Sequence, residues 1–573
     1  MAPEQERAEV VGPAADVFSL GATLAEILVG KTRVRADDTR LPSDLLELCR
    51  RSLDPDPDGR PRNAGVFSAE LLAWLEGAKD QEKAQRLLEQ AEAMRPRIAR
   101  LRAQAVVKGS AASALAAVTP SWAGVAEKAA QWALEDESRE LDAEAESQFL
   151  QAVHLLCGAL SHAPRLSAAH RALAEHFRWR HEKAETDGDI PGALRAAVLL
   201  RDHDDGRYTD WLAGDGRLTL VTDPPGASVT LHRFVERERR LVPDPVGALG
   251  VTPLRSVSLP MGSYLLEIRA PGRTDVRYPV RVGRQEHWDG VAPGATEPVA
   301  VVLPLERAIG PDEVYVPPGW FVAGGEPNGF GALSRRRVWV DGFCMARFPV
   351  TLGDFVAYLN TLPSAEALRL VPRMRSAQPE VIGGLALSKR DGKFVVGSVD
   401  PEDDADQPVS RVTWFAAQAY SRYHALRTGL PWRLPSELEW EKAARGTDGR
   451  DFPWGNYLDH TWANVDGSRE GRGRLAPVDS CPIDVSVYGV RGLGGNVQDW
   501  CLEVWRPEGP AVDLGRSVRP TGDTTEGDLR VNKGGFWNGT AHFARSSMRS
   551  WNAPANRHAS LGFRLARSLS SGS

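Results

Sequence analysis

Hydrophobic and polar residues alternate with two different periods along this chain. From 79 to 213, apolar residues recur at i, i+3 and i+4 among Ala, Leu, Glu and Arg, which is typical of amphipathic helices. From 216 to 304 the period falls to two, and Pro-Gly turn signals separate the runs, which predicts β-strands. Beyond 309, glycines, tryptophans and short apolar runs are typical of a loop-rich α+β domain. The pattern therefore predicts a multidomain α+β chain.

The first 78 residues carry a helical pattern of their own. The apolar spacing from Asp16 to Val29 predicts a helix, and Gly30 follows it as the expected C-cap. The segment 41–75 predicts two further helices around a Pro-Asp turn. We therefore expect this region to be α-helical.

Three motifs in this region resemble the last third of a eukaryotic-type Ser/Thr protein kinase. In chain order they are Ala2-Pro3-Glu4, Asp16-Val17-Phe18-Ser19-Leu20-Gly21 and Asp58-Gly59-Arg60-Pro61. The resemblance implies a partial kinase C-lobe over residues 1–78. In that lobe Glu4 and Arg60 would form a buried ion pair, and Asp16 would have a structural role.

The groups that transfer phosphate in such kinases precede the first of these motifs. They are a Gly-rich loop, a strand lysine, a catalytic-loop Asp and Asn, and a magnesium-binding Asp. None of them is present in this sequence ahead of Ala2. We therefore expect no kinase activity from this polypeptide. One alternative stays open, in which the chain is the C-terminal part of a bacterial Ser/Thr protein kinase with sensor domains.

Residues 79–213 are expected to form a helical connector. Its amphipathic runs faintly resemble tetratricopeptide repeats, and the stretch 108–120 (KGSAASALAAVTP) is expected to divide it. His176, His181 and Glu182 are close in sequence here. A spacing of five residues scatters the two rings around a helix, whereas a metal site favours i, i+4. We therefore expect solvated histidines at these positions.

Residues 216–304 resemble a PEGA domain, a small β-sandwich. The matching residues are Pro224-Pro225-Gly226-Ala227, Thr252-Pro253-Leu254, Gly262-Ser263-Tyr264 and Ala270-Pro271-Gly272. The resemblance implies a spacer module rather than a binding domain.

Residues 309–568 contain an ordered series of motifs that resembles the formylglycine-generating (sulfatase-modifying) family. The longest runs from Arg433 to Gly446, and others are Gly495-Asn496-Val497-Gln498-Asp499-Trp500, Lys533-Gly534-Gly535 and Gly562-Phe563-Arg564. The resemblance implies a C-type-lectin-like fold. Local signals agree with it, because Ser436 and Glu439 form a predicted capping box and Gly446 is placed to end the same helix.

The family's copper chemistry is not expected in this chain. Active members oxidise a substrate cysteine with molecular oxygen and copper, and two cysteines five residues apart hold the metal. Gly539 and Ala544 stand at those positions here, and neither side chain can ligate copper. No catalytic residue is therefore assigned. A second branch of the superfamily uses iron and a His-x3-His-x-Glu pattern, from which the residues around His176 depart by one. Iron is not expected either, and a non-haem-iron oxidase stays as a second alternative.

Calcium is the metal that the resemblance does imply, since the family binds it with side-chain and backbone oxygens. The implied ligands form two groups: Asn464, the Val465 carbonyl and Glu470; and the Gly495 and Val497 carbonyls with Asp499. Gly492 stands where the family has an Asn, so the second group has lost a ligand. A structural hydrogen bond in the core around Trp500 is an equally weighted role for Asp499.

The segment between Gly535 and Gly562 lines the substrate pocket in this family. Here it is dense in Trp, Asn, Arg and His, which are typical of recognition surfaces. The residues predicted to contact a protein or peptide ligand are Trp537, Asn538, His542, Arg545, Arg549, Trp551 and Asn552. A competing interpretation makes the arginines buried ties between loops, and we favour it for Arg564.

Charge, hydropathy and cysteine content argue against several classes of partner and site. A net charge of −6 over 573 residues, with no basic stripe, predicts no nucleic-acid partner. No apolar run of 18 residues and no secretory signal are present, so we expect no membrane insertion. Five scattered cysteines form neither a disulfide framework nor a zinc pattern. The sequence therefore predicts a cytoplasmic signalling or recognition protein whose catalytically silent C-terminal domain binds a protein or peptide.

Overall fold

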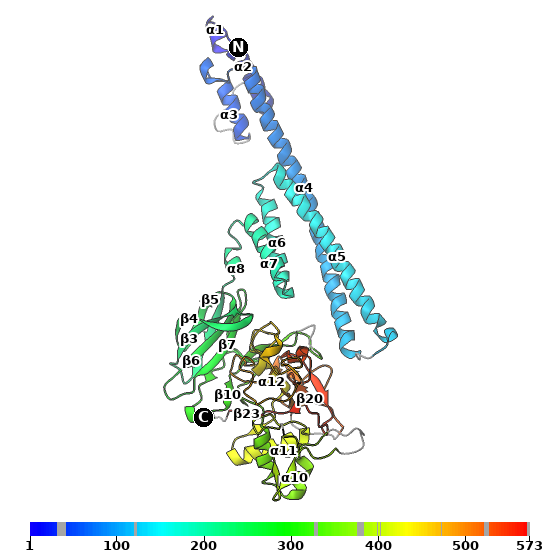
Figure 1. The fold of residues 1–573 in the computed structure, drawn as a ribbon. Coiled ribbons are helices and arrows are strands. Elements are labelled where there is room, and N and C mark those ends of the chain that lie inside the picture. The colour runs from blue at the N-terminus through cyan, green and yellow to red at the C-terminus, as the bar shows by residue number, and fades with distance from the viewer. Residues whose placement is uncertain are drawn as a thin grey trace. The chain divides into compact units, whose positions relative to one another are not determined.

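The computed structural model describes residues 1–30, 42–119, 123–325, 330–374, 383–397, 399–401, 403–471, 473–520 and 527–569. The chain divides into two compact units, Met1–Thr209 and Asp210–Ser573. The first unit is helical and the second is built mainly of strands and loops (Figure 1). Within the described residues, no helix is both long enough and apolar enough to cross a bilayer.

The N-terminal unit begins with a small helical cluster. Its elements are α1 (Pro3–Glu6), α2 (Ala14–Val29), α3 (Ser43–Ser52) and the 3-10 turn η1 (Pro57–Gly59). Gly30 ends α2 in the left-handed conformation, with φ 71°, and its N–H donates to the Glu26 carbonyl, as predicted for a C-cap. Arg60 donates through both terminal nitrogens to the Glu4 carboxylate at 2.8 and 2.9 Å, and both side chains are buried. The expected ion pair is therefore present.

Two long helices form the rest of this unit with two shorter ones. They are α4 (Ala64–Val118), α5 (Val125–His162), α6 (Ser167–Asp187) and α7 (Ile190–His203), and α4 lies alongside α5 (Figure 1). The boundary predicted between residues 78 and 79 falls within α4, which continues without interruption. The expected division at 108–120 is wrong up to residue 118, because Ala and Ser are compatible with a helix and Ala105 and Ala112 pack as buried residues.

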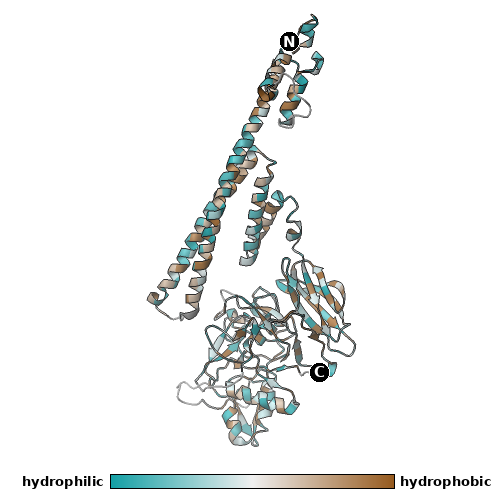
Figure 2. Cartoon of the chain, turned by 180° about the vertical axis from the view of Figure 1, so that it is seen from behind, coloured by the Kyte–Doolittle hydropathy of each residue, from teal (hydrophilic) through white to brown (hydrophobic). Residues whose placement is uncertain are grey.

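The boundary between the two units falls at the start of the short helix α8 (Thr209–Ala213), and a β-sandwich follows this helix. One sheet has the order β4-β3-β6-β7, a second has the order β5-β1-β8, and β2 pairs with β9. The strands are β1 (Gly216–Leu220), β2 (Thr222–Asp223), β3 (Ser228–Arg237), β4 (Arg240–Val251), β5 (Leu254–Leu259), β6 (Gly262–Arg269), β7 (Val276–Val282), β8 (His287–Trp288) and β9 (Val301–Val302). Hydrophobic and hydrophilic residues alternate along these strands (Figure 2), and the apolar ones from both sheets share one core.

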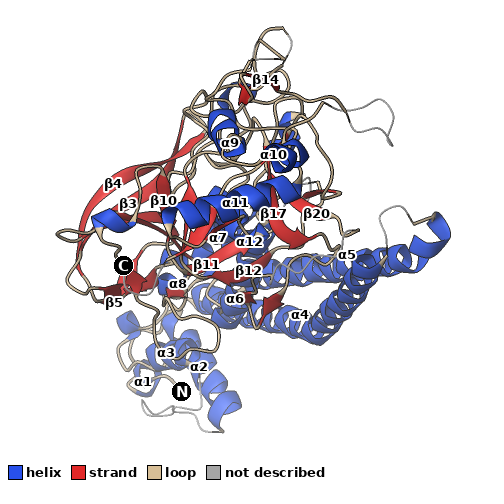
Figure 3. Ribbon diagram, turned by 90° about the horizontal axis from the view of Figure 1, so that it is seen from below, coloured by secondary structure: helices blue, strands red, loops and turns tan. Residues whose placement is uncertain are grey.

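Residues 309–569 form a domain in which loops connect short strands and helices (Figure 3). Its sheets have the orders β10-β13-β23-β16, β11-β12-β19-β18, β21-β20-β17-β22 and β14-β15. The strands are β10 (Glu313–Val316), β11 (Gly319–Ala323), β12 (Arg336–Val340), β13 (Phe343–Ala346), β14 (Ser388–Arg390), β15 (Lys393–Val395), β16 (Trp432–Arg433), β17 (Gln498–Val504), β18 (Val512–Asp513), β19 (Arg516–Ser517), β20 (Arg530–Lys533), β21 (Ser550–Asn552), β22 (Leu561–Gly562) and β23 (Ala566–Ser568). The helices are α9 (Leu352–Leu359), α10 (Ser364–Leu370), α11 (Trp414–Thr428) and α12 (Glu437–Arg445), and the 3-10 turns are η3 (His460–Trp462) and η4 (Ala541–Ala544); a further 3-10 turn, η2 (Glu306–Ala308), directly precedes the domain. Because β13 pairs with both β10 and β23, the two ends of the domain meet in one sheet.

The sandwich and this domain share buried residues and hydrogen bonds. Tyr315 and Cys344 of the domain belong to the sandwich core. Ser263 of β6 donates to Asp448 at 2.7 Å, and Arg277 of β7 donates to the Val487 carbonyl at 2.7 Å. The sandwich is therefore joined to the domain by a packed interface.

Candidate functional site

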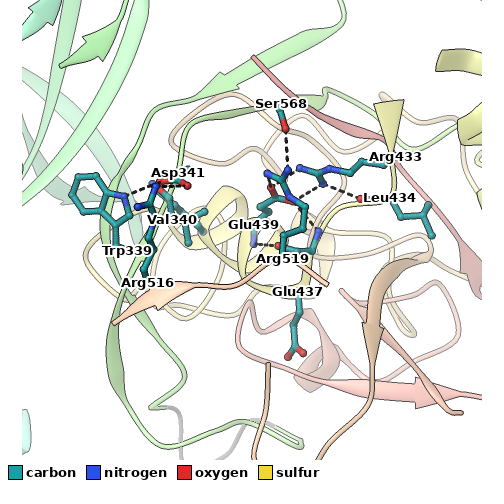
Figure 4. A network of polar contacts seen from close by, with 12 residues as sticks. Trp339, Val340, Asp341, Arg433, Leu434, Glu437, Glu439, Arg516, Arg519 and Ser568 are labelled. Atoms are coloured by element: carbon teal, nitrogen blue, oxygen red, sulfur yellow. Dashed lines mark hydrogen bonds and ion pairs between the residues drawn. The ribbon is translucent and has the colours of Figure 1, made fainter. Parts of the chain in front are cut away.

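Helix α12 organises the centre of the C-terminal domain, and all nine of its residues are buried. Its predicted caps are confirmed: Ser436 Oγ accepts from the Glu439 N–H at 3.2 Å, the Ser436 N–H donates to Glu439 at 2.8 Å, and Gly446 follows the last turn. The Glu439 carboxylate also accepts from Arg433 and Arg519 (Figure 4). A carboxylate buried this deeply stays charged because two guanidinium groups face it, and Arg433 holds its pKa below the ordinary value despite the burial.

Lys442 lies on the same helix and is buried. Its Nζ donates to three backbone carbonyls, those of Pro317 at 2.7 Å, Gly319 at 3.1 Å and Val340 at 3.1 Å. These carbonyls flank β11 and β12, so the ammonium joins α12 to that sheet. Burial lowers the pKa of Lys442 to about 7.

Arg564 ties the loop before β17 to the core, as the sequence favoured. Its Nε donates to Asp499 Oδ2 at 2.5 Å, and its terminal nitrogens donate to the Arg491 carbonyl at 3.0 Å and the Gly492 carbonyl at 2.8 Å. Trp440 Nε1 donates to the same Asp499 oxygen at 2.9 Å. The geometry supports the structural role of Asp499.

The two positions of the copper cysteines are occupied by small residues in a filled region. Gly539 and Ala544 are buried. A β-carbon at residue 539 would lie 2.6 Å from the ring of Phe536, which therefore fills the adjacent space. Ala544 Cα would lie 3.1 Å from a β-carbon on Gly535. Neither side chain offers a donor atom for a metal, and the ring of Phe536 fills the space at residue 539.

A cluster of aromatic rings surrounds this region and includes residues that the sequence did not single out. We call it the aromatic cluster: Phe330, Trp505, Phe536, Phe543 and Trp551. The rings form a chain in which each contacts the next, with neighbouring centroids 4.3 to 5.8 Å apart. The order along this chain is Trp505, Trp551, Phe330, Phe543 and Phe536. Phe330 is 52% exposed, so the cluster reaches the surface. Of these residues, only Trp551 was predicted; Phe330 and Trp505 are distant in sequence, and nothing in their local pattern marks them.

Some of the remaining residues predicted to contact a ligand are accessible to solvent, and others are hydrogen-bonded to protein partners. Asn538 and His542 are exposed, and Trp537 is half-buried. Arg545 donates to Asp451 at 2.6 Å, and Asn552 donates to Asn532 at 3.1 Å. These two side chains already have protein partners, so they position the segment.

Arg549 is buried in an ion pair with Glu437. It also donates to the Arg506 carbonyl at 3.1 Å. Its position corresponds to the competing interpretation, a buried tie between loops, and does not present the guanidinium to a ligand.

Several of the residues implied as calcium ligands already form hydrogen bonds within the protein. Asn464 Oδ1 accepts from Arg469 at 2.9 Å, and its Nδ2 donates to Asn496 at 2.8 Å. The Gly495 carbonyl accepts from the Val497 N–H at 3.0 Å, and Glu470 is exposed. Among the described residues, no three His, Cys, Asp or Glu side chains converge as a metal site. Calcium binding stays a prediction, and a cation on Asn464 would have to displace a guanidinium.

The cysteines and the helical histidines have ordinary packing environments. Cys344 and Cys501 are buried, and burial raises the pKa of Cys344 to about 12 and that of Cys501 well above its usual value. His176 stacks on Phe149, and burial lowers its pKa to about 3. His181 lies 3.5 Å from Glu185. The prediction that these two histidines are solvated is wrong, because α6 turns both toward protein neighbours.

The amino-acid sequence of the C-terminal domain is similar to those of known proteins. Residues 299–569 match the family model described as the sulfatase-modifying factor enzyme 1-like domain. The inactive C-alpha-formylglycine-generating enzyme 2 of Mus musculus is 30% identical, over 46% of this chain and 89% of that protein. The hercynine oxygenase of Mycolicibacterium smegmatis is 31% identical, over 46% of this chain and 64% of that protein.

A third relative, the serine/threonine-protein kinase Pkn1 of Chlamydia trachomatis, is 27% identical over 45% of this chain. The chain spans only 38% of that kinase and less than two thirds of the mycobacterial oxygenase. The likeness thus concerns one part of these longer proteins. Through residues 299–569, the chain belongs to the sulfatase-modifying factor enzyme 1-like family.

Proposed function

We propose that the C-terminal domain binds a protein or peptide ligand and does not carry out copper-dependent oxidation. The observation that carries this proposal is the pair Gly539 and Ala544 at the copper positions, with Phe536 filling the space beside them. Neither residue supplies the thiolate that Cu(I) requires. The mouse relative at 30% identity, whose name marks it as inactive, supports the same view.

The recognition surface of this proposal combines the aromatic cluster with Asn538 and His542. Half-exposed rings supply contact area at a small cost in conformational entropy, and exposed amide and imidazole groups supply hydrogen bonds. Calcium is the metal we propose to test, at Asn464 and its neighbours. The proposed setting is a cytoplasmic signalling protein, in which the β-sandwich is a PEGA-like spacer.

The oxidase test incubates the full chain with Cu(I), oxygen and a cysteine-containing peptide, beside an active formylglycine-generating enzyme. We expect no change in peptide mass for this chain. Conversion of the cysteine to an aldehyde would end the proposal. The binding test selects peptides on the full chain and measures the selected ones with His542→Ala. A loss of affinity is expected there but not for Leu426→Ala, which replaces another exposed residue, on α11.

A second candidate function is that of a bacterial Ser/Thr kinase of which this chain is the C-terminal part. The buried Glu4–Arg60 pair and the similarity to Pkn1 favour it. The upstream reading frame tests it: in-frame catalytic-loop and magnesium-binding motifs would support the kinase, and a stop codon directly before Met1 would end it.

A third candidate, a non-haem-iron oxidase, is favoured by the similarity to the mycobacterial hercynine oxygenase. Its test is anaerobic loading with Fe(II) followed by measurement of bound metal. One iron per chain would support it, and no bound iron would remove it.

A further inference from the structure

A polar cleft of about 540 Å³ lies beside Trp537, in the segment between Gly535 and Gly562. Its size is within the roughly 300–1,000 Å³ of ligand pockets. Three separate stretches of the C-terminal domain form it, and the charged or aromatic side chains lining it include Asp400, Asp403, Arg411, Arg469, Arg474 and Trp537. The three stretches are far apart in sequence, so the sequence alone did not predict that they form one cleft. Of the cleft residues, Trp537 was predicted to contact a protein or peptide ligand.

The cleft holds both signs of charge. The guanidinium groups of Arg411, Arg469 and Arg474 line it together with the carboxylates of Asp400, Asp403 and Glu470. Burial raises the pKa of Asp403 above its ordinary value, and Arg411 counteracts that rise. A surface with opposite charges in one recess is complementary to a ligand that also carries both.

Backbone geometry at Arg411 is unusual for a side chain of this size. Its φ is 58°, in the left-handed region. Two backbone hydrogen bonds hold this conformation, from the Arg411 N–H to the His558 carbonyl at 3.1 Å and from the Arg373 N–H to the Arg411 carbonyl at 3.4 Å. Strain of this kind persists where the surroundings over-determine it, and it concentrates at binding sites.

Trp537 forms an aromatic wall of the cleft. Its backbone N–H donates to the Asn496 carbonyl at 3.0 Å and its Nε1 donates to the Ala559 carbonyl at 3.2 Å, so the backbone and the indole are each held by one hydrogen bond. A β-carbon at Gly473 would lie 3.2 Å from the Trp537 carbonyl oxygen and 3.4 Å from the ring, so the loop that carries Gly473 lies against Trp537.

We propose that this cleft binds a ligand bearing a carboxylate and a cationic group a short distance apart, with its intervening part against Trp537. The arginines bind the carboxylate, and the two aspartates bind the cation. The inference rests on the proposed function, and it names the class of ligand: a peptide segment with neighbouring acidic and basic side chains. A free zwitterion of the amino-acid type carries the same chemistry and is a separate arm of the test.

The experiment titrates the full chain with four fluorescent peptides of equal length, carrying an Asp-Gly-Arg segment, Asp alone, Arg alone or neither. We expect the mixed peptide to bind at least about tenfold more tightly than the others, since only it can form charge-assisted hydrogen bonds with both the arginines and the aspartates. Arg474→Gln and Asp403→Asn should each weaken it by about tenfold. The matched controls Arg390→Gln and Asp391→Asn lie on the exposed β14–β15 hairpin and should change nothing. Thermal melts confirm that all variants fold.

Equal binding of the acid-only or base-only peptide, or no binding by any probe, would overturn the inference. If free arginine competes with the mixed peptide at equal affinity, the cleft chemistry stands and the peptide part of the proposed function falls. If peptide binding depends on His542 but not on Arg474 or Asp403, the proposed function stands and the cleft inference falls.

Discussion

Replacing Lys442 by methionine removes an ammonium from the centre of the domain while keeping a side chain of similar length. The three carbonyl groups of Pro317, Gly319 and Val340 would lose their donor. A buried acceptor left without a partner costs about 1–3 kcal/mol. Relief of the ammonium's desolvation, several kcal/mol, offsets part of that sum. Three unpaired carbonyls together cost about 3–9 kcal/mol, and after that offset we expect a loss of about 3–5 kcal/mol in the free energy of unfolding.

The assay is thermal and urea unfolding of the full chain at pH 6. Because burial lowers the pKa of Lys442 to about 7, the ammonium is charged in the folded and unfolded states at that pH, and no proton uptake complicates the comparison. At roughly 2–4 °C per kcal/mol, the melting temperature should fall by about 10 °C.

The matched control is Lys393→Met, on the exposed strand β15, which should leave the melting temperature unchanged. A fall of less than about 2 °C for Lys442→Met, which by the same scaling is under about 1 kcal/mol, would refute the reasoning. It would mean that the three hydrogen bonds only balance the cost of burying the charge.

Three further predictions concern other buried or reactive groups. Burial, aided by the Glu437 carboxylate, raises the pKa of Glu503 to about 8, so its contribution to stability is full below pH about 4.5 and is lost as pH rises through 8. Glu503→Gln should therefore flatten the urea stability curve between pH 5 and 8, and parallel curves would contradict this. Arg469→Ala leaves the amide oxygen of Asn464 with the Ser468 hydroxyl, 3.4 Å away, as its hydrogen-bond donor, so millimolar calcium should raise the melting temperature of this variant more than that of the wild type; equal shifts would show that Arg469 does not compete. Cys157 is exposed and the other thiols are partly or fully buried, so a thiol reagent should label one site rapidly in the native protein, and Cys157→Ser should abolish that phase.

Local signals made several structural details predictable. The capping box of Ser436 and Glu439 and the C-cap at Gly30 depend on residues three or four positions apart, so a short window of sequence contains all the partners. The period-two pattern of residues 216–304 is also a local signal. It predicted β-strands, and the structure has strands in this region.

The candidate site was predictable only in part. Composition marked the segment between Gly535 and Gly562, but it could not separate the exposed His542 from the buried Arg549. That difference depends on whether a carboxylate from a distant helix reaches the guanidinium, and Glu437 does so for Arg549. The aromatic cluster depends in the same way on Phe330 and Trp505, which lie far from η4 in sequence.

By itself, the sequence determined the order of the helical, strand-rich and loop-rich regions, the periods and caps of many elements, and the residues at the two copper positions. Only the tertiary structure decided which charged side chains are buried. Along α12, Glu441, Lys442 and Arg445 have the charge of a solvated helix face, yet all three are buried with partners. A local pattern reflects hydrogen bonds made within a few residues. The burial of a charge depends instead on carbonyls, carboxylates and rings from distant segments, and the polar cleft exists for the same reason.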